Sequence, residues 1–212
     1  MTWLLVASLW MVLPGCLSLP REGTGPVRTF LWSAPQDRQT QSVSASDAAK
    51  APIGVIIVAQ PQAQPGFDSP RMTYMKRPYE LQYFSSNEWV DQPTRMLAPL
   101  LVRAIEQQGV ARAVVGLPSS ARGDLRLDVD GVEAVQEFFD VPSHARIAFR
   151  ARLVRLSDHA VLGSHAFEAI EPAPTEDAYG GAMAANRAVA KAVDEMADWV
   201  ARCIRNPASG CK

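Results

Sequence analysis

The sequence predicts an α+β domain, that is, an α/β protein with a single, mostly antiparallel sheet covered on one face by two helices. Several stretches alternate apolar and polar residues with the period of a strand, and two longer stretches carry apolar residues at every third or fourth position. Short turns join strand to strand, with no regular alternation of strand and helix. The 212 residues suffice for one domain with its own core. We expect this domain at 28–205, followed by a C-terminal tail at 206–212.

The first half of the domain contains four predicted strands and one helix. A short strand is expected near Phe30, and the unbroken β-branched run at 53–59 fits a strand at the sheet centre. Residues 72–75 and 79–84 form two short strands around a turn. Asp91-Gln92-Pro93 is typical of a helix start and Gly109 of its exit, while Pro99 should kink this helix or mark its true beginning.

The second half contains the clearest periodic patterns. After a strand at 110–115, residues 124–130 alternate strictly, so that Leu125, Leu127 and Val129 should point inward, and Gly131 should mark a bulge. Residues 145–153 alternate in the same way and turn at 157–159 into a partner strand, 160–170. Residues 177–205 form one long amphipathic helix that Asn206-Pro207 ends.

The charges are balanced, with 21 Lys and Arg against 22 Asp and Glu, so we expect no nucleic-acid partner. Four arginines on the predicted strands, Arg126, Arg146, Arg150 and Arg152, form an outward row interleaved with acidic residues of the neighbouring strand. Two interpretations remain open. The row is either a docking or phosphate-binding surface or a set of cross-strand ion pairs.

The sequence contains no pattern typical of a catalytic or metal site. It has neither a Gly-rich phosphate loop nor a G-x-S-x-G nucleophile elbow. Ser143-His144 and Ser164-His165 are neighbours on predicted strands and would point to opposite faces. We therefore expect no enzyme, metal or cofactor, with a serine hydrolase kept only as a remote alternative.

The N-terminal stretch MTWLLVASLWMVLPGC has an apolar run too short to cross a bilayer, but suitable for a secretory signal. Leu13-Pro14-Gly15-Cys16 resembles a bacterial lipobox, which implies a signal peptide at 1–15, lipidation of Cys16 and a tether at 16–27. An ordinary signal peptide or a buried N-terminal helix are the alternatives. If Cys16 carries lipid, Cys203 and Cys211 remain as a pair for a disulfide in an oxidising compartment, or else stay as free thiols.

A group of aromatic residues precedes the first helix: Tyr74, Tyr79, Tyr83, Phe84 and Trp89. These side chains either line an apolar groove or a partner surface, or pack in the core and at its rim.

The stretch from Arg71-Met72-Thr73-Tyr74 through Tyr79-Glu80-Leu81-Gln82-Tyr83-Phe84 to Arg95-Met96-Leu97, with the lipobox, is similar to the ABC-type transport auxiliary lipoproteins, the PqiC-like family. The resemblance covers roughly residues 28–202 and implies a periplasm-facing outer-membrane lipoprotein without catalytic residues. Its partners would be an inner-membrane ABC transporter and an MCE-domain tunnel protein, in a path for lipids or other hydrophobic solutes. Leu17 after Cys16 fits release to the outer membrane. A homo-oligomer is compatible with this interpretation, and an envelope scaffold or assembly lipoprotein is its alternative.

Overall fold

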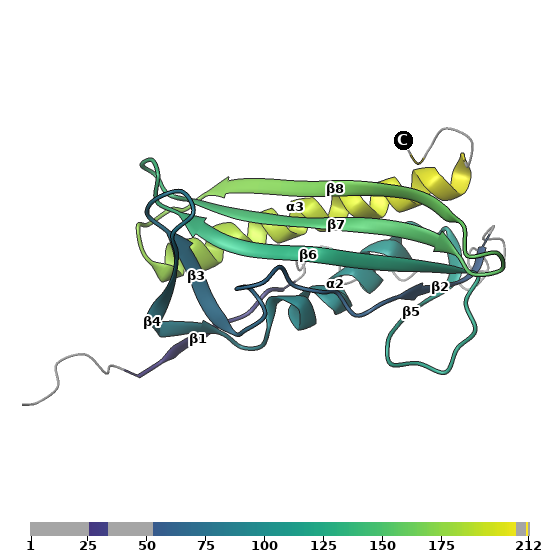
Figure 1. Cartoon of the computed structure of the whole chain (residues 1–212), viewed down its shortest axis with the longest axis horizontal. Helices are drawn as coiled ribbons and strands as arrows, with labels where there is room; N and C mark the ends of the chain where they lie inside the picture. Colours follow the sequence, from purple (N-terminus) through teal and green to yellow (C-terminus); the bar gives the residue numbers. More distant parts are fainter. Residues whose placement is uncertain (1–25, 34–52, 207–210, 212) are drawn as a thin grey trace, which may run out of the picture.

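A computed structural model describes residues 26–33, 53–206 and 211. Within them, the chain forms eight strands and two helices (Figure 1). The strands are β1 (Arg28–Phe30), β2 (Ile53–Val58), β3 (Arg71–Met75), β4 (Leu81–Trp89), β5 (Ala111–Gly116), β6 (Leu125–Glu137), β7 (His144–Arg155) and β8 (Val161–Pro172). The helices are α2 (Pro93–Gln107) and α3 (Ala178–Arg205). The prediction of an α+β domain is therefore confirmed. The predicted signal peptide, most of the tether and most of the C-terminal tail lie outside the described residues.

The sheet is organised around β6, whose 13 residues have different neighbours along each edge. One edge pairs antiparallel with β7, which in turn pairs with β8. The other edge of β6 pairs with two strands, one after the other. Strand β2 runs parallel to the first residues of β6, with Ile56 opposite Leu125, and β3 runs parallel to the last residues of β6, with Thr73 opposite Val135. Strand β5 flanks β2, while β4 and then β1 flank β3.

The prediction of a mostly antiparallel sheet was wrong. The sheet is mixed, and four of the seven pairings between the described strands are parallel. The two hairpin-type pairs, β3–β4 and β7–β8, were predicted from short turns, which force neighbouring strands to run antiparallel. The parallel partners of β2 are separated from it in sequence by a helix and two strands in the case of β5, and by a helix and three strands in the case of β6. Local patterns in the sequence do not specify such distant pairings.

Both helices cover the same face of the sheet (Figure 1). Helix α3 packs along β7 and β8, and α2 lies beside it over β5. The core between the layers is fully apolar at its centre, with Leu127, Ile147 and Leu153 from the strands and Leu101 and Met196 from the helices all completely buried. The strict alternation in β6 and β7 thus places one apolar face against the helices, as predicted.

The predicted ends of the helices agree well with the structure. Pro93 occupies the first turn of α2, and Gly109 has the left-handed φ of 61° that its exit requires. Helix α2 continues through Pro99, so this proline is not its beginning. Gly131, with a φ of 64°, lies at the register shift between β6 and β7 and confirms the predicted bulge.

The face of the sheet opposite the helices carries the predicted arginine row. Arg146 bonds to Glu133 at 2.9 Å and Glu137 at 2.7 Å, and Arg152 lies 2.6 Å from Asp130. These are cross-strand ion pairs, because β6 and β7 are neighbours in the sheet. Their charges are largely compensated within the domain, which favours the ion-pair interpretation over a phosphate-binding surface.

Candidate functional site

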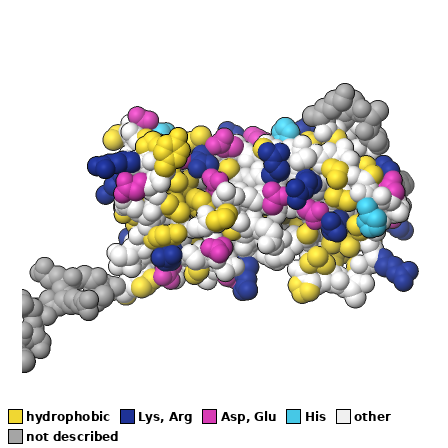
Figure 2. All heavy atoms as spheres, in the orientation of Figure 1, with side chains coloured by type: hydrophobic (Ala, Val, Ile, Leu, Met, Phe, Trp, Pro, Cys, Tyr) yellow, Lys and Arg dark blue, Asp and Glu magenta, His cyan; other side chains and the backbone are white. Residues whose placement is uncertain are grey.

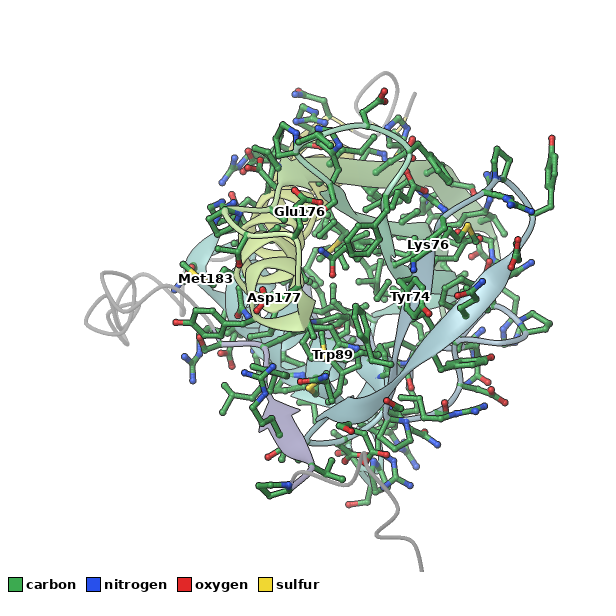
Figure 3. The ribbon with its side chains drawn as sticks, turned by 90° about the vertical axis from the view of Figure 1, so that its left-hand side faces the viewer. Tyr74, Lys76, Trp89, Glu176, Asp177 and Met183 are labelled. Carbon is green, nitrogen blue, oxygen red and sulfur yellow. A yellow bond between two sulfur atoms is a disulfide. The ribbon has the colours of Figure 1, made fainter. Side chains whose placement is uncertain are left out.

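An aromatic pocket opens at the end of the sheet where β3 ends, and we call it the end pocket. Its volume is about 340 Å³, within the range of small-molecule sites. The lining comes from β3 and β4, from the residues just past β3 and β6, and from the residue that precedes the cap of α3. These residues are Tyr74, Lys76, Tyr83, Phe84, Ser85, Phe138 and Glu176. Figure 3 looks onto this end of the molecule, with Tyr74 and Lys76 to one side and Glu176, at the start of α3, to the other.

The wall of the end pocket is built from three rings on three different segments. Tyr74 on β3 packs against Phe84 on β4, with ring centroids 4.7 Å apart. It also meets Phe138, which follows β6, edge to face at 6.0 Å. The three rings come together because β3 pairs with β4 on one side and with β6 on the other. Such tilted and edge-to-face contacts stabilise a rigid apolar wall.

Two charged groups lie at the end pocket and are held differently. The Lys76 ammonium lies 5.8 Å from the Tyr74 ring centroid, in the range of a weak cation–π contact, and its side chain is exposed. The Glu176 carboxylate accepts a hydrogen bond from the Ser143 N–H at 2.9 Å, which fixes it next to the β6–β7 turn. The end pocket therefore combines apolar walls with an exposed cation and a hydrogen-bonded carboxylate.

The helix that follows Glu176 begins with a well-formed cap. Asp177 accepts hydrogen bonds from the Thr175 hydroxyl at 2.7 Å and from the Gly180 N–H at 2.8 Å. Both hydrogen bonds lower the pKa of Asp177, the one from the Thr175 hydroxyl more than the one from the Gly180 N–H. This cap fixes the start of α3 and thereby the segment that carries Glu176.

The structure brings only some of the predicted aromatic residues together. Tyr74 and Tyr83 line the end pocket, and the Tyr83 hydroxyl donates to the Gly66 carbonyl at 3.0 Å. Tyr79 is instead fully exposed in the β3–β4 turn, with a φ of 69°, so the predicted strand start at 79 was two residues too early. Trp89 is buried and packs against Trp32 with ring centroids 5.5 Å apart.

Sequence reasoning missed four residues of the end pocket: Lys76, Ser85, Phe138 and Glu176. Phe138 could have been suspected, since it is one of two adjacent phenylalanines, which are unlike a solvated turn, although both lie beyond the strand predicted at 124–130. Lys76 and Glu176 carried no such signal, because single charged residues at strand and helix ends are common on any surface.

A larger cavity of about 530 Å³ lies beside α2, lined by residues of this helix and by the ends of β2 and β5. Burial there raises the pKa of Glu106, and the neighbouring Arg103 acts in the opposite direction. Its lining contains no aromatic side chain, and none of the predicted site residues contributes to it.

The serines considered for a hydrolase do not form a nucleophilic site. Ser143 is completely buried, and its hydroxyl accepts a hydrogen bond from the Gln136 side-chain amide at 3.0 Å. Ser164 lies on the exposed side of β8, while the ring of His165, the next residue, stacks against Trp199 of α3. Within 26–33, 53–206 and 211, no cluster of three or more His, Cys, Asp or Glu side chains could hold a metal ion.

The structure joins Cys203, in the last turns of α3, to Cys211 by a disulfide. Formation of this bond in the protein as the cell produces it stays a prediction that chemical measurement must test. Cys16 lies outside the described residues, so its lipidation stays a prediction as well. Across the described part of the chain, none of the helices has the length and apolar character needed to traverse a bilayer.

Together, the fold and the end pocket define an α+β domain whose candidate site is a pocket with aromatic walls. The chain belongs to the ABC-type transport auxiliary lipoprotein component family, which it matches over residues 35–197. No curated protein matches the chain.

Two crystal structures have the same fold. Protein XCC0632 from Xanthomonas campestris is 26% identical, with a TM-score of 0.63 over 82% of this chain and 92% of that chain. An uncharacterized protein is 10% identical, with a TM-score of 0.61 over 83% of this chain and 99% of its own, and this likeness concerns the fold alone.

Proposed function

We propose that this protein is a non-enzymatic auxiliary component of an ABC-type transport system that moves lipids or other hydrophobic solutes between membranes. In this proposal, Cys16 carries the fatty acyl chains and holds the protein on the outer membrane, facing the periplasm. The partners are an inner-membrane ABC transporter and an MCE-domain tunnel protein. Membership of the auxiliary lipoprotein family carries the proposal.

The end pocket is the proposed contact site for the solute. The rings of Tyr74, Phe84 and Phe138 form an apolar surface that can shield part of an acyl chain from water when the chain is outside a membrane. The Lys76 ammonium at the same pocket is a point charge suited to the phosphate of a lipid headgroup. Apolar walls beside an exposed cation match the two halves of an amphiphilic molecule.

Filling the end pocket tests its role. Ser85 lines the pocket and is exposed, so Ser85→Trp should block the pocket at little cost in stability. Ser164→Trp is the matched control, because Ser164 is an exposed strand residue on β8 outside the pocket. With a pyrene-labelled phospholipid in detergent as the probe, we expect Ser85→Trp to weaken binding about tenfold, a loss of about 1.4 kcal/mol, and Ser164→Trp to leave it unchanged. Equal binding by the two variants would rule out the end pocket as the lipid site.

Co-purification of the wild-type lipoprotein from detergent-solubilised envelopes tests the transport role separately. We expect ABC-transporter and MCE-domain subunits in the eluate. If neither is recovered under conditions that retain other envelope complexes, the transport proposal fails and an envelope scaffold or assembly lipoprotein describes the protein better.

A further inference from the structure

Two loops at the end of the domain expose apolar side chains to an unusual degree. Tyr79, in the β3–β4 turn, is 102% exposed, and Val141, in the β6–β7 turn, is 88% exposed. Phe139, in the same turn as Val141, is 43% exposed. We call the residues 76–80 and 138–142 the tip loops. Contact with water is unfavourable for large apolar side chains that protrude this far, so they indicate a surface that contacts something other than water.

The tip loops lie side by side and are firmly supported. Met75 and Glu137, the last residues of β3 and β6, are partners in the sheet, and the Phe138 N–H donates to the Met75 carbonyl at 2.8 Å. Beyond the second loop, Ser143 is tied to the segment before α3, since its carbonyl accepts from the Ala173 N–H at 2.7 Å. The exposed side chains are therefore presented together on a rigid frame.

The chain enters the domain at this same end. Figure 1 shows the start of β1 and the turns after β3 and β6 at the left-hand end of the molecule, and Figure 2 shows hydrophobic side chains gathered there. Val27, ahead of β1, is itself 54% exposed. Pro26 lies ten positions after Cys16 in the sequence, and even a fully extended chain of this length spans only about 35 Å.

The first tip loop presents two basic side chains, and each tip loop also carries one exposed acidic residue, Glu80 and Asp140. Lys76 and Arg77 are adjacent and exposed, next to the protruding Tyr79. Basic side chains attract phosphate groups at the bilayer surface, while tyrosine and other amphipathic rings prefer the boundary between headgroups and acyl chains. Glu80, the acidic neighbour, accepts a hydrogen bond from the Gln82 side chain.

We infer that the tip loops dock on the lipid bilayer that holds the Cys16 acyl chains, with Tyr79, Phe139 and Val141 at the level of the headgroup–acyl boundary. The inference rests on the anchor of the proposed function. It adds a second, peripheral contact that fixes the orientation of the domain on the membrane and brings the end pocket next to the lipid surface. A short tether alone would leave the domain free to rotate.

Depth-dependent quenching tests this contact in the full-length lipoprotein, reconstituted in vesicles of phosphatidylethanolamine and phosphatidylglycerol. Tyr79→Cys and Val141→Cys carry an environment-sensitive NBD label, with nitroxide-labelled lipids as quencher. Val161→Cys is the matched control, since Val161 is an apolar side chain 59% exposed at the start of β8, at the opposite end of the sheet. We expect about a twofold loss of fluorescence at positions 79 and 141 with nitroxides near the headgroups, and no loss at 161.

Flotation of the same vesicles separates the two proposals. Protein that floats with the vesicles but shows equal quenching at 79, 141 and 161 overturns the docking of the tip loops and leaves the anchor intact. Protein that does not float overturns the anchor, and with it the inference built on it. An unchanged circular dichroism spectrum is required of each labelled variant, to exclude unfolding. If one variant fails this requirement, the quenching at the other position, 79 or 141, still supports or overturns the contact.

Discussion

The cap of α3 provides a sharp test of the structure next to the end pocket. Asp177→Ala removes the acceptor for the Gly180 N–H and the Thr175 hydroxyl, and Gly180 is buried. Loss of an N-cap acceptor costs about 1 kcal/mol on average, and a buried donor left without a partner places the expected loss at about 1–2 kcal/mol. For a domain of this size, each kcal/mol lowers the Tm by about 2–4 °C.

The assay is thermal or urea unfolding of the wild type, Asp177→Ala and the matched control Asp177→Asn. Asparagine also accepts a hydrogen bond from the backbone at this position, so Asp177→Asn should retain most of the stability at neutral pH. If Asp177→Ala unfolds at the wild-type temperature, or if Asp177→Asn is destabilised as much as Asp177→Ala, the capping geometry described for α3 is wrong.

The pH dependence gives this prediction a direction. Because the folded pKa of Asp177 is lowered, its charged form stabilises the fold above the pKa of an aspartate in the unfolded chain, about 3.9. That stabilisation is lost as the pH falls through the lower folded pKa. The difference in stability between the wild type and Asp177→Asn, followed by unfolding at a series of pH values, should therefore shrink below about pH 4.

Four further substitutions test packing, charge and covalent structure through the free energy of unfolding. Gly180→Ala should cost about 1–3 kcal/mol in urea unfolding, because an added Cβ would lie 2.1 Å from the Thr175 carbonyl oxygen, and wild-type stability would contradict that contact. Arg146→Ala should cost about 2 kcal/mol, since it leaves two half-buried glutamates without their partner. Arg152 is more exposed, so Arg152→Ala should cost at most about 1 kcal/mol. Equal losses of stability in the two variants would refute this difference. Cys211→Ser should cost about 2.5 kcal/mol by opening a short loop, and a free thiol in the untreated wild type, detected with a thiol reagent, would show that the bond does not form.

Much of the local structure could be predicted from the sequence, because it depends on residues close together in the chain. The alternation through Leu125, Leu127 and Val129 identified β6 and its buried face, and Gly131 marked the bulge. The apolar period of 177–205 identified α3, and Asp177 lies at its beginning as its cap.

The pairing of strands could not be predicted in the same way. Strand β2 has the pattern of a buried strand whichever neighbours it takes, and its partners β5 and β6 begin at Ala111 and Leu125, more than 50 residues later. Only the packing of the whole core selects these neighbours. The same dependence explains Trp89: its side chain is buried by contact with Trp32, far away in the sequence.

The candidate site was only partly visible for the same reason. Tyr74 and Tyr83 were predicted to line an apolar groove or partner surface or else to pack in the core. They line the end pocket, which Phe138 and Glu176 complete through the β3–β6 pairing and the start of α3. Tyr79 was expected in the same group, and the turn directs it to solvent. Sequence patterns indicated which residue types were unusual, and the long-range pairings decided which of them meet.

The central claim is that fatty acyl chains at Cys16 hold a binding domain on a membrane surface. Mass spectrometry of the N-terminal peptide of the mature protein, isolated from the membrane fraction, tests it most directly. The account predicts a peptide that begins at Cys16 and carries the added mass of a diacylglyceryl group and an amide-linked fatty acid. An unmodified Cys16, in a protein recovered from the soluble fraction, would contradict it.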